Sequence, residues 1–397
     1  MRVTNDTLRM AFMNALETAQ RRLADTQNQV STGKRINKPS DDPLAAARIG
    51  QLDASLARLD QYQANGIVAR NQLGLEEETL ANVIDNLQRV RELAVQANNA
   101  VLDNANRATI AAELRQRLDG VLALANATDA SGRFLFAGFS EGTQPFVITG
   151  AGVAYNGDQG QRLVQVSDER LIAVNDSGSA VFQRIPSGNG TFSLAADAGN
   201  AGTGVLGAGS VVNPAAYVAD SYTIDFLSAT SYEVRDGGGG LVVAGAYAPG
   251  QSIAFLGVNV DLSGQPAAGD SFSLTPSTSQ DVFTTLNALI SALETPVTDP
   301  ASRAQLNNRV GQLLVDLDQG TVRMIEVRAD IGARLRALDQ EVSLNEGFTV
   351  QLTETLSEIR DLDYADALSL LSQQLLGLEA AQQTFARIQG LSLFKFL

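Results

Sequence analysis

Apolar side chains recur at alternating gaps of four and three residues near both ends of the chain. The N-terminal series is Phe12, Leu16, Ala19, Leu23, Thr26 and Val30. A C-terminal series runs from Ile331 to Ile359, slips by one residue near Arg360 to Asp363, and resumes at Tyr364, Leu368, Leu371, Leu375, Leu378, Gln382 and Phe385. Such heptad spacing places the side chains on one face of a helix and is typical of coiled coils. Both ends are therefore predicted to be long helices whose apolar seams pack together.

The first helix is expected to end at Gly33, because glycine readily takes the left-handed conformation found just beyond a helix end. After a short connector, Ser40-Asp41-Asp42-Pro43 predicts a new helix, since a carboxylate accepts its free amides and proline suits its first turn. This second helix has a weak point expected at Gly66 and Gly74. It and a third helix carry apolar stripes formed by Leu52, Leu56, Leu59, Leu73, Leu80, Ile84, Leu87, Ala94, Ile110, Leu114, Leu118, Val121 and Ala125.

The middle of the chain has a different character. Of the 35 glycines, 24 lie between Gly132 and Val282. Short runs rich in β-branched and aromatic residues are separated there by turn signals such as Asp236-Gly237-Gly238-Gly239-Gly240, a pattern that predicts strands. The expected strands are Arg133 to Phe139, Arg162 to Val166, Tyr222 to Leu227, Leu241 to Ala246 and Ser252 to Leu256.

Together these patterns predict an α+β multidomain fold, with a long coiled-coil-like helical bundle formed by both chain ends and an all-β domain inserted in the middle. We expect residues 1–42 and 361–397 to form a terminal coiled coil, residues 43–131 and 283–360 a helical bundle domain, and residues 132–282 an inserted β-domain.

The composition excludes most familiar enzyme chemistry. Cysteine, histidine and tryptophan are absent, which removes thiol nucleophiles, imidazole bases and the usual soft-metal ligands. The net charge of −15 argues against nucleic acid as a partner. No apolar run is long enough for membrane insertion, and the polar start does not fit a cleaved signal peptide. We therefore predict no catalytic residue, no cofactor and no bound metal.

Four groups of residues could be mistaken for chemical sites. Ser31-Thr32-Gly33-Lys34 lacks the flanking residues of a phosphate-binding loop, since Asn28 and Arg35 stand at the required positions. Two clusters of acidic residues on predicted helices are interpreted as solvent-exposed helix faces. A cluster of three aspartates in the β-domain is the only support for an enzyme there. These carboxylates are, in turn, Glu76, Glu77 and Glu78; Asp361, Asp363 and Asp366; and Asp220, Asp225 and Asp270.

The apolar seams at the chain ends point to an assembly interface. The heptads run nearly to both termini, and the chain closes on Leu391-Ser392-Leu393-Phe394-Lys395-Phe396-Leu397. Apolar surface of this extent usually marks an interaction site. The residues predicted to form the interface are Phe12, Leu16, Leu23, Val30, Leu368, Leu371, Leu375, Leu378, Phe385, Leu391, Leu393, Phe394, Phe396 and Leu397.

Several motifs carry a family resemblance. The stretch Ser31 to Pro43, with the sequence STGKRINKPSDDP, resembles the linker of the flagellin-related axial proteins of the bacterial flagellum. The lysine-to-proline part of this stretch, Gly132-Arg133-Phe134-Leu135-Phe136-Ala137-Gly138-Phe139 and the ending Leu391-Ser392-Leu393-Phe394 are similar, more narrowly, to the hook-associated protein 3 family at the hook–filament junction. The resemblance covers about the first 145 and the last 115 residues.

The resemblance implies a structural protein that reaches the extracellular flagellum through the flagellar type III channel without a cleaved leader. It further implies a homo-oligomeric ring, another hook-associated protein on the hook side and flagellin on the filament side. In such an assembly the terminal coiled coil of residues 1–42 and 361–397 would be an inner core that is disordered before assembly, and the β-domain of residues 132–282 would face outward. A cytosolic export chaperone would engage the C-terminal region, from Leu368 to Phe385 and on to Leu397. The alternatives are a divergent flagellin that forms the filament itself and, in another class, an enzyme in the β-domain.

Overall fold

The structure is a computed structural model that describes residues 5–99, 101–150 and 152–390. The chain divides into two compact units. The first combines the described residues up to Ala64 with those from Gln340 onward, and the second runs from Asn65 to Asp339. None of the helices within the described ranges is both long and apolar enough to cross a membrane.

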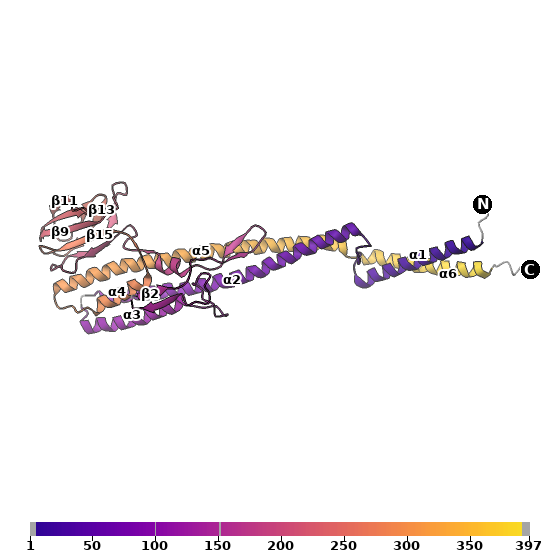
Figure 1. Cartoon of the computed structure of the whole chain (residues 1–397), viewed down its shortest axis with the longest axis horizontal. Coiled ribbons are helices and arrows are strands. Elements are labelled where there is room, and N and C mark those ends of the chain that lie inside the picture. The colour runs from indigo at the N-terminus through magenta and orange to yellow at the C-terminus, as the bar shows by residue number, and fades with distance from the viewer. Residues whose placement is uncertain (1–4, 100, 151, 391–397) are drawn as a thin grey trace, which may run out of the picture. The chain divides into compact units, whose positions relative to one another are not determined.

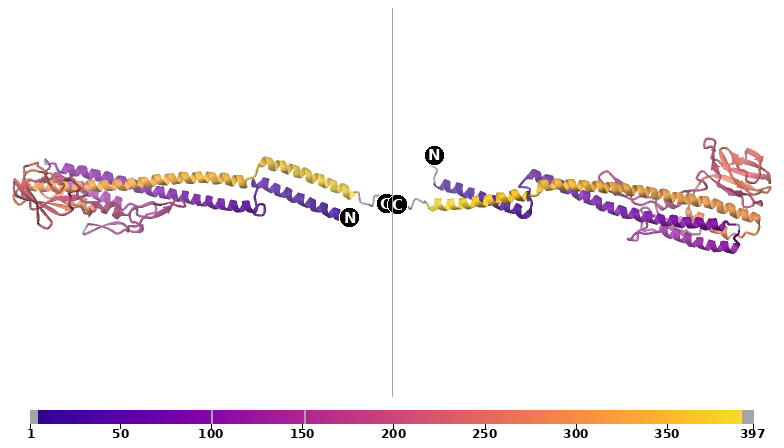
Figure 2. Two further views of the ribbon diagram at one scale, coloured as in Figure 1. Left: turned by 90° about the horizontal axis from the view of Figure 1, so that it is seen from above. Right: turned by 180° about the vertical axis from the view of Figure 1, so that it is seen from behind.

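Helices build the first unit. Helix α1 (Asn5–Thr32) lies beside α6 (Tyr364–Gly390), as both views of the chain show (Figures 1 and 2). The beginning of α2 (Pro43–Ala97) and the end of α5 (Pro300–Arg360) also belong to this unit. The predicted boundaries are confirmed: Gly33 follows α1 with φ of 70°, and α2 begins at Pro43 with the amide of Ala45 bonded to Asp42 Oδ1 at 3.0 Å.

The heptad slip near Arg360 is also confirmed as a structural break. Helix α5 ends at Arg360 and α6 begins at Tyr364. By contrast, the weak point expected at Gly66 and Gly74 is wrong, because α2 continues through both residues. Leu73, which precedes Gly74, and Leu80, further along the helix, are fully buried, so packing outweighs the roughly 1 kcal/mol that glycine costs in a helix.

In the second unit, helix α3 (Asn104–Ala125) lies beside α4 (Val282–Glu294). The predicted apolar stripes of α2 and α3 are buried here, including Leu73, Leu87 and Leu114. The middle of the chain adds the strands β1 (Phe146–Thr149), β2 (Gly152–Tyr155), β3 (Leu163–Gln165), β4 (Leu171–Ala173), β5 (Ile185–Pro186), β6 (Phe192–Ala196), β7 (Val205–Leu206), β8 (Ser210–Val211), β9 (Tyr222–Ser228), β10 (Ser231–Asp236), β11 (Leu241–Ala246), β12 (Ile253–Phe255), β13 (Val258–Val260), β14 (Leu262–Ser263), β15 (Ser271–Pro276) and β16 (Ser279–Gln280).

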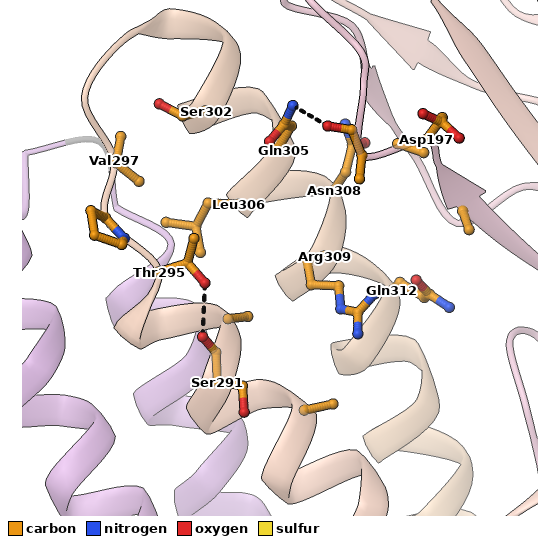
Figure 3. Close-up of a pocket in the computed structure, with 16 residues that line it drawn as sticks. Asp197, Ser291, Thr295, Val297, Ser302, Gln305, Leu306, Asn308, Arg309 and Gln312 are labelled. Carbon is orange, nitrogen blue, oxygen red and sulfur yellow. Dashed lines mark hydrogen bonds between the residues drawn. The ribbon is translucent and has the colours of Figure 1, made fainter.

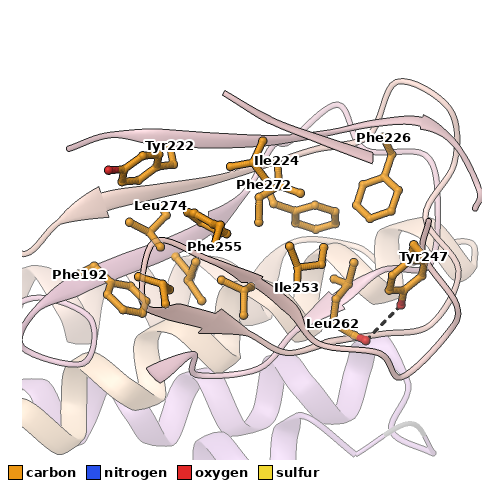
Figure 4. Packing of buried hydrophobic residues seen from close by; sticks show 14 residues of the cluster. Phe192, Tyr222, Ile224, Phe226, Tyr247, Ile253, Phe255, Leu262, Phe272 and Leu274 are labelled. Carbon is orange, nitrogen blue, oxygen red and sulfur yellow. Dashed lines mark hydrogen bonds between the residues drawn. The ribbon is translucent and has the colours of Figure 1, made fainter. Parts of the chain in front are cut away.

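The strands form small antiparallel sheets around an aromatic core. The largest has the order β11-β10-β9-β15-β6, and β12-β13-β8 and β14-β7 are separate sheets. Buried side chains from these sheets, among them Tyr222, Phe226 and Phe272, pack together (Figure 4). The hydroxyl of Tyr247 ties this core to the chain by donating to the carbonyl of Leu262 at 3.1 Å.

The strand expected at Arg133 to Phe139 is wrong. This segment forms turns, with one isolated bridge between Thr128 and Phe134. Gly138 has φ of 72°, and a Cβ there would lie 2.3 Å from the carboxylate of Asp158, so the backbone cannot continue as a strand. Phe136 instead inserts its ring edge-on against Phe182, with centroids 5.2 Å apart.

The middle region is also not purely β. Residues Ser179–Gln183 form a short π-helix, η1, which carries Phe182. The ring of Phe182 lies against Phe146 and against Phe283 of α4, at centroid distances of 5.3 and 6.0 Å. The first part of the glycine-rich region therefore shares an aromatic core with helix α4, separate from the core shown in Figure 4.

Candidate assembly surface

The N-terminal heptad faces the C-terminal helix of the same chain. Phe12, Leu16, Leu23 and Val30 are half-buried along α1, and Phe12 stacks on Phe385 of α6 with centroids 5.2 Å apart and planes 11° apart. The expectation that the seams of the two chain ends pack together is confirmed. Burial of such side chains against each other is the main source of stability for a helix pair.

The face of α6 that meets α1 is offset from the seam inferred from the sequence. It contains Leu371, Leu378 and Phe385, and these alternate with Ala367, Gln374 and Ala381, which are also buried or half-buried. Two other predicted interface residues, Leu368 and Leu375, keep 50% and 46% of their surface exposed. The chain's own helix pair therefore uses one edge of the predicted seam and leaves these two leucines uncovered.

Four leucines of α6, which we call the outer leucines, are left uncovered: Leu368, Leu370, Leu375 and Leu376. They are between 46% and 67% exposed. At about 100° per residue, Leu368 and Leu375 lie on one side of the face that meets α1, Leu370 lies on the other side, and Leu376 faces away from it. Sequence reasoning missed Leu370 and Leu376. The signal for them is the leucine doublets at 370–371 and 375–376, because neighbouring helical residues are about 100° apart and cannot both face one seam. The predicted residues Leu391, Leu393, Phe394, Phe396 and Leu397 lie outside the described residues.

Exposed apolar side chains also lie on other helices of the first unit. Leu344, Phe348 and Val350 of α5 are each more than half exposed, and Met10 of α1 is 69% exposed. Leu344 and Phe348 are four residues apart and so lie on one face of α5. Apolar surface of this extent on several helices is characteristic of a surface that another protein covers.

The connector after α1 binds the end of α5 through backbone hydrogen bonds. The amide of Arg35 donates to the carbonyl of Arg360 at 2.7 Å, and the amide of Leu362 donates to the carbonyl of Gly33 at 3.0 Å. The guanidinium of Arg35 donates to the carbonyl of Ile359 at 2.6 Å. We call this arrangement the joint. In the joint, the STGKR part of the sequence motif lies beside the break between α5 and α6.

Local hydrogen bonds shape the rest of the connector. The carboxylate of Asp41 accepts the amides of Asn37 and Lys38 at 3.0 and 2.9 Å, and these bonds lower the pKa of Asp41. Asp361 is bonded to Ser357 at 2.7 Å and to Arg360 at 3.2 Å, which lowers its pKa as well. Asp41 thus folds the backbone of the connector, whereas Asp361 lies just after α5 and is bridged to Lys34 through the backbone.

The interpretation of the glutamate run as a solvated face is wrong for its first member. Glu76 is 1% exposed and accepts the amide of Asp176 at 3.1 Å through Oε1, while its Oε2 is buried without a hydrogen-bond partner. Burial, followed by the nearby carboxylate of Asp176, raises the pKa of Glu76 well above its ordinary value. Asp176 itself is held by both terminal nitrogens of Arg334, each at 2.9 Å.

The other two glutamates differ from Glu76. Glu77 is half-buried and pairs with Arg328 of α5, so the solvated reading is wrong for it too. Glu78 is exposed, as expected. The Asp361 group is not on a helix face throughout, because Asp361 lies at the joint and Asp363 caps α6 by accepting the amide of Ala365 at 2.9 Å.

The aspartates of the β-region have structural roles of their own. Asp270 is buried and accepts the amides of Ala201 and Ala267 at 2.8 and 2.9 Å, and Asp220 accepts the amide of Ser221. Across the described ranges, no group of three or more acidic side chains is arranged to hold a metal ion. The hypothesis of an acidic catalytic cluster at Asp220, Asp225 and Asp270 is therefore not supported by their placement.

Comparison with known proteins identifies the family. The model of the bacterial flagellin N-terminal helical region matches residues 3–141. Flagellar hook-associated protein 3 of Salmonella typhimurium is 24% identical over 396 residues, which cover 100% of this chain and 99% of that protein. The crystal structure of Xanthomonas campestris FlgL is 39% identical, with a TM-score of 0.73, and the match covers 77% of this chain and 99% of that chain.

A third relative is the flagellar junction protein FlgL from Legionella pneumophila. Its crystal structure is 34% identical with a TM-score of 0.73, and the match covers 79% of this chain and 100% of that chain. These relatives are flagellar structural proteins and not enzymes. The chain is accordingly a structural component of the flagellum related to flagellin, and it belongs to the flagellar hook-associated protein 3 (FlgL) family.

Proposed function

We propose that the chain is the adaptor between another hook-associated protein and the flagellin filament. The observation that carries this proposal is the end-to-end similarity to hook-associated protein 3, while the match to the flagellin family model spans residues 3–141. One relative is named a junction protein. A subunit with two different neighbours needs contact surfaces beyond those of a self-polymer, and the exposed apolar residues of several helices supply candidates.

The outer leucines and the terminal helices are proposed to build a ring of copies. Their exposed area would be buried against neighbouring subunits, and each fully buried leucine contributes about 1.5–3 kcal/mol. Phe12, Leu16, Leu23, Val30, Leu371, Leu378 and Phe385 then act within each subunit by holding α1 on α6, and Leu368 and Leu375 act between subunits. The tail residues Leu391, Leu393, Phe394, Phe396 and Leu397 are proposed to extend this contact.

Export is part of the same proposal. The chain would pass unfolded through the flagellar type III channel without a cleaved leader, with a cytosolic chaperone on its C-terminal region. The outer leucines support this, because a surface that is apolar before assembly needs a protective partner in the cell. Ordering of the terminal helices is then coupled to assembly.

Placement along the flagellum tests the adaptor role. Intact flagella are labelled by immunogold with an antibody against residues 192–276, which contain the sheet of Figure 4. A single band where hook meets filament is the expected result. Label along the whole filament would make the chain a divergent flagellin instead, and a deletion strain that still holds its filaments would refute the adaptor role.

Two substitutions test the assembly surface. Leu368→Asp and Leu375→Asp would each place a carboxylate in the subunit contact, at a cost of several kcal/mol, and so prevent incorporation. Gln51→Asp is the control, since Gln51 is an exposed glutamine on α2 of the first unit, away from the outer leucines in the sequence. The amount of each variant in the culture medium separates a failure of export from a failure of assembly. Normal motility of both leucine variants would contradict the assignment of this surface.

A further inference from the structure

The cavity shown in Figure 3 does not define a ligand. It has a volume of about 370 Å³ and is lined by residues of α4, of the first turns of α5 and of the segment 195–198. Asp197 and Arg309 both line it, so it favours neither sign of charge. The reactivity of the chain's own side chains is more specific.

An asparagine that precedes a glycine can react with its own backbone. Glycine has no Cβ, so its amide nitrogen approaches the side-chain carbonyl carbon of the asparagine without hindrance. In a folded protein the reaction requires that this side chain and the attacking amide are free to meet. The chain contains the pair three times, at Asn65-Gly66, Asn156-Gly157 and Asn189-Gly190.

The first of these pairs is held inside a helix. Asn65 and Gly66 belong to α2, whose amides are bonded to carbonyls one turn earlier. The side-chain amide of Asn65 also donates to the carbonyl of Gln165 at 2.8 Å. Both reacting groups are therefore fixed.

The last pair is held in a turn. The side-chain oxygen of Asn189 accepts the amides of Thr191 and Phe192, each at 3.0 Å. The amide of Gly190 donates to the carbonyl of Ser187 at 3.3 Å. Hydrogen bonds thus occupy the side chain and the attacking amide here as well.

The middle pair is free at both reacting groups. Asn156 is exposed, and within the described ranges no hydrogen bond reaches its side chain, its carbonyl or the amide of Gly157. The backbone is anchored on either side of the pair. The amide of Asn156 donates to the carbonyl of Pro145 at 2.7 Å, and the amide of Asp158 donates to that of Ala137 at 3.1 Å. The peptide unit between these anchors is free to rotate toward the side chain.

The fold requires the glycine that makes this pair reactive. A Cβ at Gly157 would lie 2.5 Å from the hydroxyl oxygen of Tyr155 and 2.9 Å from the carbonyl oxygen of Ala137. The hydroxyl of Tyr155 is itself fixed, because it donates to the carbonyl of Asp158 at 2.7 Å. A larger residue after Asn156 would therefore disturb this loop.

We propose that Asn156 is a site of spontaneous deamidation. The amide nitrogen of Gly157, once hydroxide has removed its proton, attacks Cγ of Asn156. A five-membered succinimide ring forms, and the side-chain nitrogen takes up a proton and leaves as ammonia. Water then opens the ring at either carbonyl and leaves an aspartate or an isoaspartate in place of the asparagine. Either product adds one negative charge to the loop after β2.

The test follows the three pairs separately in one protein. The full chain is incubated at pH 9, folded or in urea, digested with trypsin in heavy-oxygen water and analysed by mass spectrometry. The heavy oxygen marks rings that open only during digestion. Trypsin places the pairs in the peptides 59–70, 134–162 and 185–235, and the middle peptide contains a single asparagine.

Two variants complete the test. Asn156→Gln blocks the reaction, because glutamine would have to close a less favourable six-membered ring. Asn82→Gln, at an exposed asparagine of α2 that precedes a valine, is the control. Thermal unfolding of each variant verifies its fold.

In the folded chain, Asn156 should deamidate at least tenfold faster than Asn65 and Asn189, because those two must break hydrogen bonds before the attack. In urea all three should react at similar rates. A methyltransferase specific for isoaspartate should label the aged wild type and Asn82→Gln, and label in the peptide 134–162 should be lost in Asn156→Gln. The proposal is overturned if Asn156 reacts no faster than the other two asparagines in the folded chain, or if that peptide takes up no methyl label.

Discussion

The buried carboxyl of Glu76 predicts an unusual stabilising substitution. Its pKa is raised well above 4.5, mainly by burial and next by the carboxylate of Asp176. In the unfolded chain Glu76 ionises near its ordinary pKa. Above that pH, ionisation therefore stabilises the unfolded state but not the folded state, in which the carboxyl stays protonated. Stability from this group is fully present below pH 4.5 and is lost as the pH rises toward the folded-state pKa, at about 1.4 kcal/mol for each unit.

The substitution Glu76→Gln removes this dependence. An amide keeps a carbonyl oxygen to accept the amide of Asp176 and leaves the paired Asp176 and Arg334 in place. We expect Glu76→Gln to raise the free energy of unfolding at pH 8 by about 2 kcal/mol, within the range for relief of a poorly solvated polar group. In a unit of this size, each kcal/mol shifts the melting temperature by roughly 2–4 °C.

Thermal unfolding of the full chain at pH 4, 6 and 8 measures the effect. The difference between Glu76→Gln and the wild type should vanish at pH 4 and grow as the pH rises. Glu78→Gln, two residues away and exposed, should change stability by less than about 0.5 kcal/mol at every pH. Destabilisation by Glu76→Gln at pH 8 would mean that the carboxyl is ionised and stabilised in the folded protein, and it would refute the argument.

Further substitutions probe other contacts of the chain. Gly33→Ala should destabilise the joint by about 1–2 kcal/mol, because φ is 70° and the new Cβ would lie 2.8 Å from the hydroxyl of Tyr364; circular dichroism on melting measures the loss. Asp176→Asn should cost roughly 3 kcal/mol in thermal unfolding by leaving Arg334 without its carboxylate. In the assembled protein, Phe385→Ala should lower the melting temperature of the α1–α6 pair by removing about 0.5–1.5 kcal/mol of ring stacking on Phe12, and an unchanged melt would exclude the stacked contact.

Periodicity predicted the helices well because it records which side chains are buried together. The α1 seam and the end of α5 at Arg360 follow directly from the spacing of apolar residues. The seam of α6 was predicted with an offset, since leucine doublets give a helix two adjacent apolar faces and spacing alone cannot say which one the chain covers itself. Ala367 and Ala381 mark the covered face, but alanine carries little hydrophobic signal.

Contacts between distant segments account for the other errors. Glu76 looks solvent-exposed in its own helix, and it is buried because the chain near Asp176 folds over it. Phe136 lies in a sequence that resembles a strand, yet Gly138 turns the backbone toward Asp158. The position of β6 at the end of its sheet had no local signal either, because whether a strand lies at the edge of a sheet depends on the order in which all the strands pair.

The joint has a consequence for the order of folding. Its bond from Arg35 to Ile359 closes a loop between residues 324 positions apart, whereas helices α1 and α6 need only local bonds to form. The entropic cost of closing a loop grows only slowly with its length, but the two ends of so long a loop meet rarely while the chain between them is unfolded. We therefore expect the joint to close late in folding, after the local helices on either side of it have formed.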